Sequence, residues 1–296
     1  PTYSIGISES FNDYSKTYCD SFKLPNFQFL LRQIPSYMIL DDHEIRDHWS
    51  REMLDTLSFF EDRPEIYKNA IHAYECWQHM RNPPTPRHQY WYSFEQNSHP
   101  FFVIDARTRR RFRPQRKVRR STLGDEQFGE LLDWLFETRQ APVRFIASSV
   151  PFFPDTHKCT DKWDSFDEER ALILEFIRAE NIGKTVFLCG NVRLGCFARM
   201  SCLQNDSFTV HSLVSSPLYW PYHGMKTKDF YQQRTMCYNQ WKDSQHRHRK
   251  LYEYSYESHG WLAGNQFCQV AIDENGCGTA RQFSMKSGQF EAVHHF

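Results

Sequence analysis

Residues 34–49, which read IPSYMILDDHEIRDHW, join a short apolar run to a dense group of ionisable side chains. The apolar residues 37–40 predict a short buried strand, and the acidic block Asp41–Glu44 follows that strand directly. Ligands of α/β sheets bind at the carboxyl ends of strands. Carboxylate oxygens suit hard cations, and imidazole suits transition metals or proton transfer. The stretch therefore predicts a ligand site, with a solvated acidic turn as the simpler alternative.

The composition of the chain does not indicate a binding partner, because positive and negative charges are balanced. The chain has 296 residues, enough for one large domain or two small ones, and Lys+Arg and Asp+Glu number 36 each. It has no apolar run long enough to span a membrane and no visible signal peptide. Its nine cysteines form no Cys-x-x-Cys pair, which favours free thiols in a reducing compartment. We therefore expect a cytoplasmic or otherwise intracellular protein of unknown oligomeric state, with residues missing upstream of Pro1.

Hydrophobic periodicity predicts helices alternating with strands, followed by short strands alone. Helices are expected over residues 10–33, with an interruption near Pro25, and over 61–80, 123–139 and 166–181. Strands are expected over residues 89–95, 100–105, 143–148, 184–189, 196–203, 208–215, 251–256, 260–273 and 279–285. The polar stretch 221–250 is expected to be a loop with a short helix. The pattern predicts an α/β fold in which strands come first with helices and later as a meander.

The acidic block is the first of several motifs that follow one another in a fixed order. The others are IDARTRR at 104–110, LGDEQ at 123–127, ASSVP at 147–151, FLCGNVR at 187–193 and SSPLY at 215–219. This ordered set, over roughly residues 10 to 285, resembles the PhoD-like metallophosphatases. The hallmark of that family is a strand ending in Trp-Asp-Asp-His-Glu, and Leu40 stands here in place of the Trp.

The resemblance implies a metallophosphoesterase-like α/β/β/α sandwich of PhoD type, formed by residues 1–296 as one domain. The family also has earlier strands with a Gly-Asp-x-x-Tyr motif whose Asp bridges the metals. That motif is not found in this sequence. The resemblance therefore implies that the chain is N-terminally truncated or has lost that half of the site.

The resemblance also implies a metal site at the acidic block. Asp42 stands at the position of a metal ligand, and His43 would lie beside the phosphate as a donor or catalytic acid. Asp47 and His48 come where relatives often have Asp-Asn, and they are further candidate ligands. The ions would be divalent or trivalent, such as Ca, Fe, Mn, Zn or Mg.

Acidic and basic residues are expected to frame this metal site. Asp41 and Glu44 would not touch the metal themselves but would orient the residues that ligate it. Arg107 and Arg110 suit bidentate hydrogen bonding to a phosphate, and they are the expected catalytic cations. Asp105 either belongs to the site or pairs with one of these arginines. We expect the acidic block and Arg107 to face one cleft.

The motif at 187–193 departs from the family pattern. Asn191 replaces an Asp, and Arg193 replaces a metal-binding His. An Asn can still offer one carbonyl oxygen to a metal, whereas Arg has donors only and cannot ligate. The two changes together add about two positive charges, the charge of one divalent cation. Arg193 would therefore bind phosphate where relatives bind metal.

Two functions follow from these observations. The first is a metal-dependent phosphomonoesterase or phosphodiesterase acting on a phosphorylated small molecule or a phosphodiester, and weakened or inactivated by the changes at Asn191 and Arg193. The second is a catalytically degenerate module that binds a phosphorylated ligand or a polyanion. Nine of the 14 residues from 107 to 120 are Lys or Arg, which suits nucleic acid. Only one aromatic residue, Phe112, stands among these cations to stack on bases, so nucleic acid is not the favoured ligand.

Overall fold

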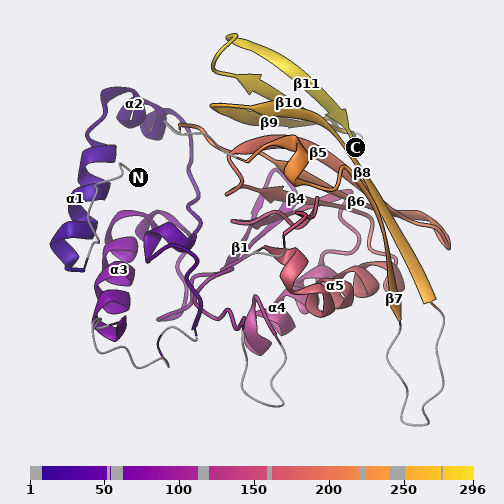
Figure 1. The fold of residues 1–296 in the computed structure, drawn as a ribbon, viewed down its shortest axis with the longest axis horizontal. Coiled ribbons are helices and arrows are strands. Elements are labelled where there is room, and N and C mark those ends of the chain that lie inside the picture. Colours follow the sequence, from indigo (N-terminus) through magenta and orange to yellow (C-terminus); the bar gives the residue numbers. More distant parts are fainter. Residues whose placement is uncertain are drawn as a thin grey trace. The chain divides into compact units, whose positions relative to one another are not determined.

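The structure is a computed structural model, shown in Figure 1, and it describes residues 9–51, 54, 63–112, 120–158, 162–219, 225–239, 251–274 and 276–296. The chain divides into two compact units, each with its own buried core. The first unit comprises residues 1–93 and 103–124, and the second comprises residues 94–102 and 125–296. The single domain over 1–296 stays a prediction.

Helices dominate the first unit. They are α1 (Phe11–Phe22), α2 (Pro25–Gln33), α3 (Arg63–Trp77) and the single-turn helices η1 (Asp42–Glu44) and η3 (His79–Arg81). Ser10 and Asp13 begin α1 with a reciprocal cap, because each side chain accepts the other's backbone N–H, at 3.0 and 3.3 Å. Pro25 begins α2, where its missing N–H costs nothing. The predicted interruption at this proline is confirmed.

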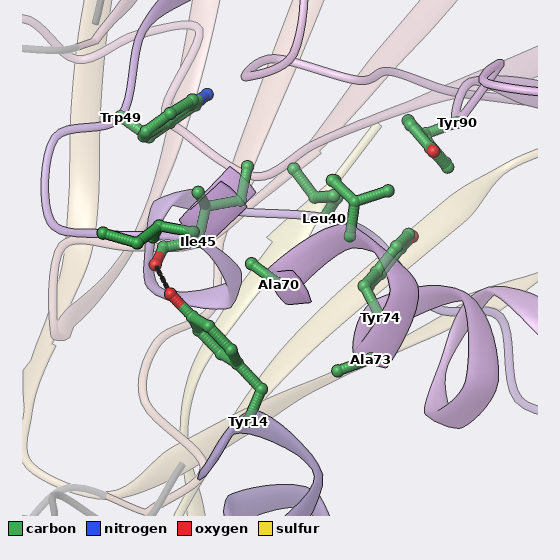
Figure 2. Close-up of a cluster of buried hydrophobic side chains, with 10 residues drawn as sticks. Tyr14, Leu40, Ile45, Trp49, Ala70, Ala73, Tyr74 and Tyr90 are labelled. Carbon is green, nitrogen blue, oxygen red and sulfur yellow. Dashed lines mark hydrogen bonds between the residues drawn. The ribbon is translucent and has the colours of Figure 1, made fainter. Parts of the chain in front are cut away.

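The core of the first unit gathers apolar side chains around the segment that carries the acidic block (Figure 2). Leu40 and Trp49, on either side of that block, are each only 1% exposed. The Tyr14 hydroxyl donates to the Ile45 carbonyl at 2.8 Å, and this bond ties α1 to the loop. Ala70, whose side chain is short, lets α3 approach this segment closely. The acidic residues are thus held between two buried apolar anchors.

The strand predicted over residues 37–40 is wrong. This segment is extended but belongs to no sheet. Its backbone is satisfied by side chains instead, because Asn82 accepts the Met38 N–H at 2.7 Å and donates to the Met38 carbonyl at 2.9 Å. The Tyr92 hydroxyl donates to the same carbonyl at 2.8 Å. Periodicity predicted the burial of Leu40 but could not show that distant side chains replace a strand partner.

The second unit is built on an eight-stranded sheet that takes in most of the hairpin β1–β2. The strands are β1 (Tyr92–Gln96), β2 (His99–Val103), β3 (Val143–Ser148), β4 (Lys184–Cys189), β5 (Leu194–Cys202), β6 (Asn205–Val214), β7 (Gln233–Asn239) and β8 (Leu251–Ala263). Their spatial order is β1-β2-β3-β4-β6-β5-β8-β7. Strands β3, β4 and β6 are parallel, so their carboxyl ends meet at one edge.

A second sheet packs face to face on the first. It contains β9 (Gln266–Ile272), β10 (Gly278–Ser284) and β11 (Gln289–His295). Phe145, Phe197 and Phe296 lie in the core between the two sheets. The helices α4 (Gly124–Glu137) and α5 (Asp167–Ala179) lie on the other side of the large sheet (Figure 1). This layering is that of a mixed α/β sandwich.

Several predicted boundaries differ from the structure. Strand β8 runs through Gly260, whose φ of +64° lets the strand bend without ending, and the turn comes at Gly264 (φ +92°). The stretch 221–250, predicted to be a loop with a short helix, contains the one-turn helix η5 (Thr227–Asp229) but also strand β7, which was not predicted. Strand β11 was not predicted. None of the described helices has the length and apolar character needed to cross a lipid bilayer.

Candidate metal and phosphate site

The Asp42 carboxylate is fixed by the chain around it. This residue is 2% exposed. Its Oδ1 accepts the His43 backbone N–H at 2.9 Å, and its Oδ2 accepts the His48 backbone N–H at 3.0 Å. His48 reaches this position with a φ of +56°, a backbone conformation that side-chain-bearing residues seldom adopt. The loop therefore curls around the carboxylate and holds its oxygens in place.

Arg107 supports the acidic loop from inside the first unit. Its guanidinium is fully buried; Nε donates to Asp41 Oδ1 at 2.7 Å, and Nη2 lies 2.6 Å from the same oxygen in an ion pair. Its Nη2 also lies 3.8 Å from Asp42 Oδ1. The structure thus brings Arg107 to the acidic block, as predicted, but places it beneath the loop with no exposed surface. A direct contact with phosphate stays a prediction for this residue.

Three side chains of the loop form a group that suits one metal ion. Single ligand atoms of Asp42, His43 and Asp47 all lie within 4.8 Å of one another. His43 Nε2 lies 3.6 Å from Asp47 Oδ1. The His43 side chain is 31% exposed and that of Asp47 is 65% exposed, so the group is open to solvent. Two carboxylates and an imidazole suit Mn, Fe or Zn better than a purely oxygen-liking ion.

Two other predicted residues of the block lie outside this group. His48 Nε2 is 3.8 Å from Asp47 Oδ2, and the His48 side chain is 64% exposed. Glu44 turns inward, where its Oε2 accepts the Asp41 N–H at 2.9 Å and its Oε1 accepts from Gln78 at 3.3 Å. Burial, and secondarily the charge of Asp41, raises the pKa of Glu44. Glu44 shapes the loop, and sequence spacing gave no sign that Gln78, the residue directly after α3, would donate to its carboxylate.

The motif at 104–110, which carries the predicted catalytic arginines, is held in a turn by its own aspartate, Asp105. Asp105 Oδ1 accepts the N–H groups of Arg107 and Thr108, each at 2.9 Å, and its Oδ2 accepts the Thr108 hydroxyl. These bonds form a tight turn that presents Arg107 to the acidic loop. Arg110 is 1% exposed, and its carbonyl accepts the Arg51 N–H at 2.8 Å. Residues 113–119 of the basic run lie outside the described residues.

In the second unit, the motif at 187–193 lies at the edge of the large sheet where the parallel strands end. Asn191 and Arg193 follow β4, whose neighbours β3 and β6 end at Ser148 and Val214. Both residues have left-handed backbones, with φ of +61° and +56°. Asn tolerates this conformation, but for Arg it is a strained one that is found mainly at functional sites. The Arg193 N–H donates to the Ser216 hydroxyl at 3.2 Å.

The two-sheet sandwich, with parallel strands ending at one edge, defines a metallophosphoesterase-type α/β fold. The chain matches the family model for PhoD-like phosphatase over residues 6–268, and it belongs to this family. No curated protein matches it.

Two solved structures share this fold. One, described as "Structure of PhoD", has a TM-score of 0.60 at 14% sequence identity over 100% of this chain and 61% of that chain. The other is the purple acid phosphatase PPD1 from seeds of yellow lupin (Lupinus luteus), with a TM-score of 0.57 at 13% identity over 96% of this chain and 44% of that chain. The chain spans less than two thirds of either structure.

Proposed function

We propose that the chain is a metal-dependent phosphoric ester hydrolase of low activity, which holds one cation on Asp42, His43 and Asp47. The observation that carries this proposal is the convergence of these three side chains at one place open to solvent, with the buried Asp42 carboxylate already oriented. Phosphomonoesters or phosphodiesters are the proposed substrates. A bound divalent ion would polarise a phosphoryl oxygen and offset its developing charge.

The chain's own residues orient the metal ligands. Arg107 fixes Asp41 and, with the two backbone N–H groups, prevents the Asp42 carboxylate from turning away. His43 lies partly exposed beside Asp47, so its imidazole would ligate the cation, and the proton for a leaving group would come from solvent, to which this group of ligands is open. Arg107 is a positioning residue in this account, because it acts through Asp41 and Asp42.

The residues after β4 do not fit a second cation. Relatives place an anionic ligand and an imidazole here, whereas Asn191 offers one amide oxygen and Arg193 offers only donors. Within the described residues, the group in the acidic loop is the one three-ligand cluster of metal-binding type. The strained backbone of Arg193 favours a second candidate function, a degenerate module that binds phosphate at this edge without hydrolysing it.

Metal titration separates these functions. The full chain, freed of metal by a chelator, is titrated with Mn²⁺ or Zn²⁺ by calorimetry, and hydrolysis of p-nitrophenyl phosphate is followed in parallel. We expect one ion to bind, and Asp47→Asn to weaken binding and activity together. Asp206→Asn removes an equally exposed carboxylate from the second unit and should change neither. Absence of metal binding, with phosphate binding retained, would favour the degenerate module.

A further inference from the structure

A groove between the two sheets of the second unit carries an excess of positive charge. It has a volume of about 720 Å³, and Lys184, Arg199 and Arg281 line it. Asp273 is the one carboxylate on its walls among the described residues. Glu257 stands opposite Arg199 in the sheet register, yet neither Arg199 nor Arg281 forms an ion pair with a described residue. Unneutralised guanidinium groups around a cavity favour an anionic ligand.

This groove is separate from the loop that carries Asn191. Lys184 begins strand β4 and Cys189 ends it, so the groove and that loop lie at opposite ends of a six-residue strand. At about 3.3 Å per residue, such a strand is roughly 17 Å long. Lys184 is held in place by donating to the Gly276 carbonyl at 3.2 Å. The groove is therefore a different site from the loop that carries Asn191.

A buried histidine lines this groove with one ring nitrogen still available. His211 lines the groove but is only 3% exposed, and its Nδ1 lies 2.9 Å from His294 Nε2. His294 Nδ1 in turn lies 2.9 Å from Nε2 of His259, an exposed residue of β8. His211 Nε2 makes no hydrogen bond to any described residue. Burial lowers the pKa of His211 to about 3 and that of His294 to about 4, so both rings are neutral at neutral pH.

Because the His294 ring in the middle is neutral and carries one N–H, the two bonds of this row have only two consistent arrangements of their protons. In one, each ring donates toward the groove: His259 Nε2–H to His294, His294 Nε2–H to His211, and His211 Nε2–H into the groove. In the other, every bond is reversed and His211 presents a lone pair. An anion in the groove stabilises the first arrangement, because a lone pair would repel it. Binding at the groove would therefore set the tautomer of His259 as well.

We propose that this groove binds a phosphorylated small molecule and that His211 donates its Nε2–H to the phosphate. The ligand's charge meets Lys184, Arg199 and Arg281. The volume far exceeds that of one phosphate, and Ile272 and Phe296 on the walls offer an apolar surface to an organic group. The site does not depend on the metal site of the acidic loop.

The test uses the full chain with ¹⁵N-labelled histidine, kept in chelator, and phenylphosphonate as a phosphate mimic that cannot be hydrolysed. We expect millimolar or tighter binding to move the ring ¹⁵N resonances of His211 and His294 to the Nε2–H tautomer, with His259 following. The variant Arg199→Gln/Arg281→Gln should weaken the response about tenfold for each guanidinium removed. Lys228→Gln/Lys286→Gln removes the same charge from exposed positions of this unit and should leave the response unchanged.

Three outcomes would overturn the proposal. They are unchanged histidine resonances at saturating phenylphosphonate, an equal response in the arginine variant, and equal binding of benzoate, which carries one charge and no phosphonate. Circular dichroism of each variant checks that the sheets remain folded. His211→Gln identifies the His211 resonances and should also weaken binding.

Discussion

Replacing Arg107 by Met should destabilise the acidic loop more than any nearby charge change. The substitution leaves Asp41 and Asp42 without the buried guanidinium that contacts both. Removing one partner of a buried ion pair costs about 3–5 kcal/mol. The Asp41 side chain is 21% exposed, so water recovers part of that loss, whereas the Asp42 side chain is 3% exposed. We therefore expect about 3 kcal/mol, at the lower end of the range.

The assay combines urea unfolding with hydrogen exchange. The backbone N–H groups of His43 and His48 are bonded to Asp42, so their exchange rates report on opening of this loop. Arg107→Lys keeps the positive charge but loses the planar guanidinium group, so it should lower the free energy of unfolding by less than Arg107→Met does. Arg111→Gln, at an exposed neighbouring position, is the matched control and should change stability by about 0.5 kcal/mol or less. A loss below about 1 kcal/mol in Arg107→Met, with unchanged exchange, would refute the supporting role of Arg107.

Three further predictions concern other buried ionisable groups. Burial raises the pKa of Glu44, so its ionisation opposes folding and stability should fall as pH rises above 4.5; Glu44→Gln should flatten this dependence in urea midpoints. The pKa of His211 is lowered from 6.5 to about 3, so unfolding takes up a proton and stability should fall as pH drops below 6.5, with His211 contributing up to about 1.4 kcal/mol per pH unit. His294, whose pKa is lowered to about 4, contributes its own slope over the same range, so His211→Gln should reduce the slope without abolishing it. An unchanged slope would contradict the burial of a neutral His211 ring. Arg144 is fully buried and donates to the carbonyls of Thr138, Ala141 and Gly183, so Arg144→Met should cost about 2–4 kcal/mol by thermal unfolding. A cost no larger than that of Arg139→Gln, at a half-buried position nearby, would contradict this.

Sequence periodicity predicted most elements of the fold because burial is periodic in helices and strands. Helix α4 and strands β3 and β4 lie within a residue or two of their expected bounds. Strand β11 was missed because its exposed residues Phe290 and Val293 break the expected alternation of apolar and polar faces. The segment 37–40 was misassigned because an apolar run does not show whether its backbone partner is a strand or an Asn side chain.

The candidate site was predictable only in part. Motif order placed the acidic block and the basic motif in one site, and the structure joins them through the Arg107–Asp41 pair. Sequence could not show that Arg107 is buried beneath the loop, nor that His43 rather than His48 stands with Asp42 and Asp47. These facts depend on loop curvature, which the left-handed backbone of His48 produces and no local propensity predicts.

The most direct test of the central claim is the metal content of the purified full chain. Equilibrium dialysis against Mn²⁺, Fe²⁺ or Zn²⁺ followed by elemental analysis counts bound ions per chain, and bis(p-nitrophenyl) phosphate hydrolysis is measured on the same samples. We predict one ion per chain, lost on Asp47→Asn, and slow hydrolysis that depends on that ion. Two tightly bound ions with rapid hydrolysis would contradict the account, because Asn191 and Arg193 would then have to be compatible with a complete two-metal centre.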